Sequence, residues 1–210
     1  MSRSAARIDA FTAAYYAAKL AAHGPTPKGV DWKDRASHIL RHRQFLRLFE
    51  KDPAASVIDL GCGFGDFLPF LREAGLAGPY LGYDIAPEMV AEARRLHGEA
   101  PDRAWRLGSP APDSGDFAVA SGIFNVRGQI APSAWSRHVR RTLDVLAAAA
   151  RRGFGANFLS LASDPEKRRA DLHYADPARM LAYCQKRYGR SVALLHDYGL
   201  YEFTLLVRRP

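Results

Sequence analysis

The chain has 210 residues, of which 48% are hydrophobic and 25% charged, so it can bury a core and is long enough for one domain with a small addition. No apolar run reaches the length of a membrane-spanning helix, and the first residues lack the continuous apolar segment of a secretory signal. Two cysteines, Cys62 and Cys184, are too few for a disulfide framework or a four-ligand zinc site. We therefore expect a cytoplasmic protein without a membrane partner.

The formal net charge of +8 favours anionic partners, such as nucleic acid, phosphorylated metabolites or acidic lipids. A compositional bias toward arginine is the alternative, because the basic residues are scattered along the chain. Several of them lie near predicted helix ends, where a positive charge complements the helix dipole. Both interpretations stay open at this point.

The first fifty residues are predicted to be helical, and the rest alternates between strand and helix. Helices are predicted over 4–22 and 37–49, with a turn-rich connection over 23–32. Strands are predicted at 56–60, 80–85, 104–108, 116–121, 155–161, 192–196 and 201–207, and further helices at 66–74, 87–96, 133–150 and 177–188. Pro87 stands in a first helical turn, and Gly153 is expected to end the long helix before the fifth strand.

This alternation predicts an α/β fold, because strands separated by helices form right-handed βαβ units. We expect a doubly wound, mostly parallel sheet of seven strands whose last strand is antiparallel, since only a short turn separates the final two. Residues 1–52 are expected to form a helical cap and residues 53–210 a Rossmann-like domain. The helix over 37–49 is expected to bury an apolar face made of Ile39, Leu40, Phe45, Leu46, Leu48 and Phe49.

A glycine-rich turn after the first strand is the sharpest chemical signal. The stretch from Val57 to Gly65 reads V-I-D-L-G-C-G-F-G. Glycines allow a tight turn and let the backbone approach a ligand where a Cβ would collide. Asp84 stands at the end of the next strand, where a carboxylate can accept both ribose hydroxyls of an adenosine. The pair of features predicts a site for an adenosine-containing cofactor.

With these residues the chain resembles the class I S-adenosylmethionine-dependent methyltransferases, whose first strand reads hydrophobic-(D/E)-hydrophobic-G-x-G-x-G. The resemblance extends over roughly residues 56–207 and implies a Rossmann-like methyltransferase that uses S-adenosylmethionine and releases S-adenosylhomocysteine. A dinucleotide-binding dehydrogenase would instead have G-x-G-x-x-G, and here Asp66 occupies the final position.

The resemblance implies a role for each matching position around the cofactor. Asp59 would order the glycine loop and approach the methionine amino group, Asp84 would hold the ribose, and Ile85 with Met89 would flank the adenine. The family usually has an aspartate after the third strand, where this chain has Gly108-Ser109, so a serine or a backbone group must serve. The cofactor-binding residues implied are Asp59, Gly61, Cys62, Gly63, Gly65, Asp84, Ile85, Met89, Gly108, Ser109, Ser121 and Gly122.

The end of the fourth strand would face the transferable methyl group. The (D/N)-P-P-(F/Y/W) signature of nucleic-acid amino-methyltransferases is absent there, and so is the acidic metal constellation of the catechol-type enzymes. We therefore expect no metal. Phe124 and Arg127 follow this strand and are expected to bind the substrate; Arg127 could instead anchor its loop by hydrogen bonds.

Methyl transfer is an in-line displacement, so positioning supplies much of the acceleration and a general base is optional. His173 and Tyr174 follow the fifth strand at the carboxyl edge of the sheet, where ligands bind in open α/β folds. They are the catalytic candidates together with Asn125, although a lone loop histidine is often merely solvated.

The N-terminal segment is expected to close over the pocket. Tyr16, His23, Trp32 and Arg41 are the further substrate-binding candidates in this lid. Tyrosine and tryptophan on an amphipathic helix can equally well serve only to pack it on the domain.

The sequence thus favours a methyltransferase that acts on a small metabolite or natural product. An RNA methyltransferase with a basic surface is the alternative, and a noncatalytic cofactor-binding protein is a third possibility. An enclosed pocket under the N-terminal helices would indicate a small molecule, whereas a contiguous basic surface would indicate RNA. The sequence specifies neither the acceptor atom nor an oligomeric state.

Overall fold

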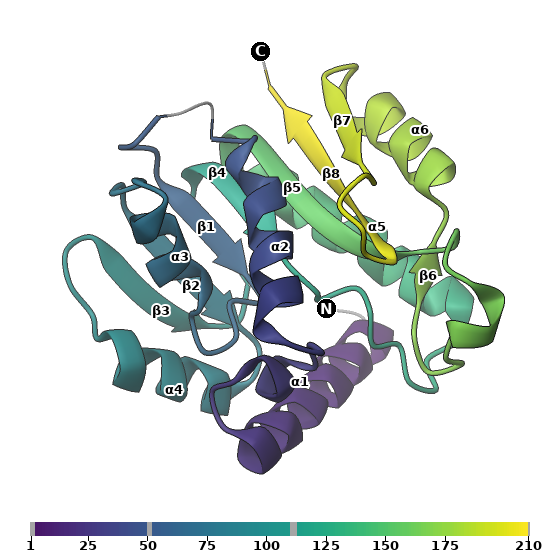
Figure 1. Ribbon diagram of the computed structural model, residues 1–210, viewed down its shortest axis with the longest axis horizontal. Coiled ribbons are helices and arrows are strands. Elements are labelled where there is room, and N and C mark those ends of the chain that lie inside the picture. The colour runs from purple at the N-terminus through teal and green to yellow at the C-terminus, as the bar shows by residue number, and fades with distance from the viewer. Residues whose placement is uncertain (1–2, 50–51, 110–112, 210) are drawn as a thin grey trace.

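A single sheet of eight strands forms the centre of the computed structural model, which describes residues 3–49, 52–109 and 113–209 (Figure 1). The strands are β1 (Val57–Leu60), β2 (Tyr80–Asp84), β3 (Arg103–Leu107), β4 (Gly115–Ala120), β5 (Ala150–Ser160), β6 (Tyr174–Ala175), β7 (Val192–Leu195) and β8 (Glu202–Arg208). The helices are α1 (Arg3–His23), α2 (Arg35–Leu46), α3 (Phe67–Glu73), α4 (Pro87–His97), α5 (Pro132–Ala149) and α6 (Pro177–Tyr188), with short 3-10 helices η1 (Pro27–Val30) and η2 (Pro165–Lys167).

The strand order confirms the predicted doubly wound sheet. Along the main path it is β3-β2-β1-β4-β5-β8-β7, parallel from β3 to β5, with β8 antiparallel to both of its neighbours. All seven predicted strands are present. The two-residue strand β6, which pairs with the end of β5, is an addition that the sequence analysis missed. The order reverses between β1 and β4, and in such sheets ligands bind beyond the carboxyl ends of the strands at the reversal.

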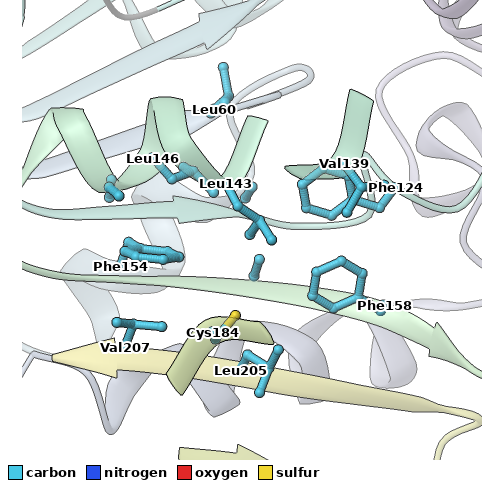
Figure 2. Close-up of a cluster of buried hydrophobic side chains, with 14 of the residues drawn as sticks. Leu60, Phe124, Val139, Leu143, Leu146, Phe154, Phe158, Cys184, Leu205 and Val207 are labelled. Atoms are coloured by element: carbon cyan, nitrogen blue, oxygen red, sulfur yellow. The ribbon is translucent and has the colours of Figure 1, made fainter. Parts of the chain in front are cut away.

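Helices cover both faces of the sheet and bury one apolar cluster on each. Helices α5 and α6 contribute Leu143, Leu146 and Cys184 to one cluster, where they meet Phe154 and Phe158 of β5 (Figure 2). On the other face, α2, α3 and α4 pack over β1, β2 and β4. No helix in the described parts of the chain is long and apolar enough to cross a membrane.

The buried face of α2 differs from the expected one. The helix starts at Arg35 behind an Asp34 cap, and its buried residues are His38, Arg41, His42 and Phe45, while Ile39, Leu40 and Leu46 are only partly buried. Polar side chains can occupy this face because the domain supplies partners for them. Glu202, for example, accepts two hydrogen bonds from Arg41.

The end of the N-terminal segment is continuous with the core. Leu48 and Phe49 are fully buried, and the Phe49 ring packs edge-on against Phe117 of β4 at 5.4 Å between centroids. The division of the chain into a cap over 1–52 and a domain over 53–210 stays a prediction.

Strand β5 begins earlier than predicted. The helix before it ends at Ala149, so Gly153 lies inside β5 and does not end the helix. A Cβ at Gly153 would stand 2.5 Å from the carbonyl oxygen of Val207. A glycine is therefore needed at this position because β8 approaches the backbone closely.

Candidate functional site

The glycine loop between β1 and α3 has the backbone that the sequence predicts. Gly61 and Gly63 have φ values of +77° and +56°, a region that residues with a Cβ rarely adopt. A Cβ on Gly61 would lie 2.1 Å from Cγ2 of Ile123. The amides of Gly61 and Cys62 donate to the carbonyl of Tyr83 at 2.7 and 2.9 Å, so the loop is held against the end of β2.

Asp84 joins this loop to the end of β2. Its carboxylate accepts hydrogen bonds from the amides of Gly63 and Ala86, both at 2.9 Å. Burial raises the pKa of this carboxyl, and hydrogen bonds from the amides of Ala86, Gly63 and Ile85 oppose that shift. A carboxylate has about four acceptor positions, so the group can still accept a hydroxyl from a ligand.

Asp59 is a second buried carboxyl, one strand away from Asp84. The hydroxyl of Tyr80 donates to it, and burial raises the pKa of Asp59 to about 7. The neighbouring thiol of Cys62 is also buried, which raises its pKa well above the ordinary value and keeps it protonated. Both residues line a small cavity of about 40 Å³ beside the glycine loop.

A larger cavity of about 530 Å³ also borders the loop, and its volume is typical of small-molecule sites. It extends from the strand ends to helices α1 and α5. The predicted site residues that line it are Gly61, Gly63, Asp84, Ile85, Met89, Ser109, Ser121, Gly122, Tyr16 and Trp32. The glycine loop, the Asp84 carboxylate and this volume together fit an adenosine-containing cofactor.

Trp32 closes the cavity at the end of β4. A Cβ on Gly122, where φ is +79°, would stand 2.5 Å from the Trp32 ring, so the indole lies directly on the Gly122 backbone. The amide of Gly122 donates to Oδ1 of Asn157 at 2.7 Å, and Nδ2 of the same side chain donates to Ser121 at 3.1 Å. Asn157 therefore fixes this edge, a role that the sequence analysis missed.

Asp31 fixes the backbone next to Trp32. It adopts a left-handed conformation with φ of 61°, unusual for a residue with a side chain. Tyr15 of α1 donates to its carboxylate at 2.8 Å, and the Lys19 ammonium lies 2.6 Å from it. These contacts hold the connection after η1 against α1.

Arg41 supports Trp32 and does not line either described cavity. Its guanidinium donates to Glu202 of β8 at 2.6 and 2.8 Å, and its central carbon lies 3.9 Å from the centroid of the indole. The expected substrate contact of Arg41 is thus replaced by a buried ion pair under the tryptophan.

Several predicted site residues lie away from the two described cavities, namely Gly65, Gly108, His23, Phe124, Asn125, Arg127, His173 and Tyr174. A Cβ on Gly65 would meet the Trp105 ring at 2.5 Å, so this glycine serves packing. Phe124 is fully buried and stacks on Phe158. His23 is exposed at the end of α1.

Hydrogen bonds to the backbone hold the catalytic candidates in place. The amide of His173 donates to the carbonyl of Asn125 at 2.8 Å, and the Asn125 side chain accepts from the amide of Leu159 at 3.3 Å. Arg127 donates to two backbone carbonyls. Burial and then Arg127 lower the pKa of His173 to about 4. Tyr174 accepts from the amide of Arg169 at 3.0 Å. The catalytic roles of His173, Tyr174 and Asn125 stay predictions without support from this geometry.

The far wall of the large cavity consists of residues that the sequence analysis missed: Asp9 and Thr12 of α1, and His138, Arg141, Thr142 and Val145 of α5. Counted from His138, the other α5 residues stand three, four and seven positions further along, which places all four on one helix face. The spacing identifies the face but does not indicate that this face borders a cavity.

The protonation of this wall follows from its contacts. Burial and then Arg141 lower the pKa of His138 to about 4, so its ring is neutral at neutral pH. Nδ1 of His138 lies 3.3 Å from the guanidinium of Arg141, which can only donate, so Nδ1 accepts and Nε2 carries the proton. Burial raises the pKa of Asp9, and Arg141 partly offsets that effect.

The fold, the glycine loop and the acidic end of β2 are those of an enzyme with an adenosine-containing cofactor, and the comparisons assign the chain to the methyltransferases. A family model described as "Methyltransferase domain" matches residues 58–152. The curated "Putative methyltransferase Rv1506c" of Mycobacterium tuberculosis (strain ATCC 25618 / H37Rv) is 47% identical over 165 residues, which covers 78% of this chain and 99% of that protein. The chain belongs to the class I S-adenosylmethionine-dependent methyltransferases.

Solved structures share the fold. The N-methyltransferase NodS from Bradyrhizobium japonicum WM9, in complex with S-adenosylhomocysteine, superposes with a TM-score of 0.67 at 15% identity over 95% of this chain and 98% of that one. Magnesium protoporphyrin IX methyltransferase from Synechocystis PCC 6803, also with S-adenosylhomocysteine, gives 0.63 at 15% identity over 83% and 84%. S-adenosylmethionine is the cofactor of this family, and the glycine loop and Asp84 border the described cavity.

Proposed function

We propose that this enzyme transfers the methyl group of S-adenosylmethionine to a small molecule, which binds between α1 and α5. The observation that carries the proposal is the continuity of one cavity. The same space that borders Gly61 and Asp84 also borders Asp9 and Thr12 of α1 and His138 of α5. A ligand seated against the two helices therefore shares an enclosure with the cofactor.

The cover over this cavity favours a small acceptor over RNA. Helix α1 supplies part of the wall, so the space lies under the N-terminal segment. Among the described residues that line it, Arg141 is the only one with a permanent positive charge. RNA recognition depends on phosphate contacts from several basic side chains and on stacking platforms. The lining supplies no basic track along which a phosphate backbone could bind.

Several arginines form ion pairs elsewhere on the domain. Arg72 pairs with Asp102, Arg151 with Asp116, and Arg187 with Asp144, in each case at 3.0 or 3.1 Å. These pairs are neutral, so they do not account for the net charge of +8, but they show arginine used in surface contacts away from the cavity.

The residues around the cofactor bind and orient, and the cofactor supplies the activated methyl group. Asp84 accepts the ribose hydroxyls and, through the Gly63 amide, keeps the loop in place. Trp32 and Tyr16 cover the cavity from the N-terminal side and exclude water. In this proposal residues 1–52 act as the cap, and holding the two reactants together supplies most of the acceleration.

Asp9 and His138, on the far wall of the large cavity, determine which acceptors can bind. His138 presents an Nε2 proton, so it binds a hydrogen-bond acceptor, and Asp9 offers a carboxylate that can receive a proton. An acceptor with a hydroxyl or amine as the attacking atom and a second polar group fits this pair.

The test is methyl transfer from labelled S-adenosylmethionine to cell extracts separated into metabolite and RNA fractions. We expect label in the metabolite fraction, and at least about a tenfold loss of turnover in Asp9→Asn with unchanged S-adenosylhomocysteine affinity. His196→Asn, a change of an exposed histidine outside both cavities, is the matched control and should keep full turnover. Label confined to RNA, or an Asp9→Asn variant with normal turnover, would contradict the proposal.

A further inference from the structure

Two histidines and an aspartate meet in the small cavity beside the glycine loop. His38 and His42 are one helical turn apart on the buried face of α2, and Asp66 immediately precedes α3. One ligand atom from each of the three lies within 4.8 Å of the others. Nδ1 of His38 is 3.5 Å from Oδ2 of Asp66. Two ligands of one tetrahedral zinc ion, with bonds of 2.0–2.1 Å, lie about 3.4 Å apart.

The histidines have ring nitrogens without a protein partner. His38 and His42 are only 5% and 2% exposed, and Nδ1 of each makes no hydrogen bond among the described residues. Buried polar atoms are rarely left without a partner, because the lost solvation is not compensated. The Asp66 oxygen, 3.5 Å from Nδ1 of His38, is too distant for a good hydrogen bond, so both nitrogens retain the capacity to bind a ligand.

Asp66 also departs from its ordinary role. An aspartate at the N-cap position normally accepts a hydrogen bond from an amide in the first helical turn. The Asp66 side chain makes no such bond, and one of its oxygens faces the His38 ring instead. The carboxylate is therefore directed to the histidines at the expense of its helix.

Aromatic contacts hold the two imidazoles in place. The His42 ring packs on Phe67 and Phe70 of α3, with centroids 4.8 and 5.3 Å away, and the His38 ring lies 4.5 Å from that of His42. His38, His42 and Asp66 all line the cavity of about 40 Å³, which exceeds the about 10–15 Å³ needed for one water-sized occupant.

The charges around the cavity suit a cation. Asp59 lines the same space, so two carboxyl groups face it. Two arginines act on the histidines: Arg41 is balanced by its bidentate pair with Glu202, and Arg35 is exposed to solvent at the start of α2. An imidazole binds a metal ion through the lone pair of an unprotonated ring nitrogen, and each of the two rings offers one such nitrogen without a hydrogen-bond partner among the described residues.

We propose that His38, His42 and Asp66 form a binding site for one divalent transition-metal ion, with Zn²⁺ as the ion that suits these nitrogen and oxygen donors. The ion would connect α2 to the start of α3 and so fasten the N-terminal segment to the glycine loop. This site is separate from the strand-end acidic constellation whose absence led the sequence analysis to expect no metal.

The experiment uses untagged full-length protein treated with a chelator and then titrated with Zn²⁺ or Co²⁺. We expect one ion per chain by calorimetry, visible Co²⁺ absorption bands, and a higher midpoint of thermal unfolding with metal. His42→Gln and Asp66→Asn should each weaken Zn²⁺ binding at least about 100-fold, since each removes a direct ligand. His196→Gln is the matched control and should bind like the wild type.

Absence of one-to-one binding, or equal binding by His42→Gln, would overturn the proposal. So would a His42→Gln variant that loses affinity for S-adenosylhomocysteine while the wild type binds no metal, because the cluster would then belong to the cofactor site. Circular dichroism shows whether each variant folds, and His38→Asn, which keeps a polar side chain of smaller size, serves as the second variant if His42→Gln does not.

Discussion

Replacing Asp59 by asparagine should stabilise the cofactor-free enzyme and weaken cofactor binding. The carboxyl is 3% exposed, and burial raises its pKa from the ordinary 3.8 to about 7. Ionisation of this group in the folded protein therefore costs about 4 kcal/mol more than in the unfolded chain, at 1.36 kcal/mol per unit of pKa. Asparagine is never ionised, and its carbonyl can still accept the Tyr80 hydroxyl.

The sign of the pH dependence follows from the raised pKa. Between pH 3.8 and about 7, Asp59 is protonated in the folded protein and ionised in the unfolded chain. The free energy of unfolding is therefore highest below this window, and it falls as the pH rises through the window. Above pH 7 the wild type bears the full cost. We expect Asp59→Asn to be more stable by about 3 kcal/mol at pH 8, after about 1 kcal/mol for an amide N–H without a partner.

Cofactor binding should respond in the opposite sense. If Asp59 receives the methionine ammonium, the carboxyl must ionise on binding, so affinity for S-adenosylhomocysteine falls toward tenfold per pH unit below pH 7. Asp59→Asn should show low affinity with no such slope. The assays are denaturant unfolding at pH 5 and 8, and calorimetric titration from pH 5.5 to 7.

Two results would refute this reasoning. Equal stability of wild type and Asp59→Asn at pH 8 would mean that the carboxyl is ionised without cost. A pH-independent affinity in the wild type would mean that Asp59 does not contact the ammonium group.

Three further changes test the surroundings of the site. Gly122→Ala should displace Trp32 and lower turnover at least about tenfold, because the new Cβ would lie 2.5 Å from the indole; normal steady-state kinetics would show that the ring is not needed there. Arg41→Met should lower the free energy of unfolding by about 3–5 kcal/mol, because it leaves Glu202 buried and unpaired; urea unfolding measures this. A decrease under about 1 kcal/mol would mean that the Glu202 carboxylate is exposed to water in the variant. Cys62→Ala should keep most activity, since its protonated thiol is no nucleophile; complete loss in a folded, cofactor-binding variant would indicate a covalent step.

Local patterns in the sequence were sufficient for the fold and for the juxtaposition of the glycine loop with Asp84. The glycine loop and Asp84 lie at the ends of adjacent strands, so their meeting follows from the strand order alone. The acceptor wall could not be derived in this way. Asp9 and His138 each occur on helices far apart in the chain, and nothing local distinguishes them from ordinary helix-surface residues.

The buried polar face of α2 was hidden for a related reason. His38, Arg41 and His42 have the composition of a solvated face, and the apolar residues of the same helix suggested the opposite orientation. Their burial depends on Glu202 from the last strand and on Asp66 from the glycine loop, and helix periodicity contains no information on either partner.

The ion pair between Arg41 and Glu202 also sets the order in which the enzyme can be completed during synthesis. Glu202 belongs to β8, the final strand, which inserts between β5 and β7. A nascent chain that has emerged through β5 already contains the glycine loop and Asp84, yet Arg41 still lacks its partner, and Trp32 lacks the guanidinium beneath it. Contacts between such distant positions form late. The contacts that hold Trp32 over the cavity can therefore be complete only after β8 has been synthesised.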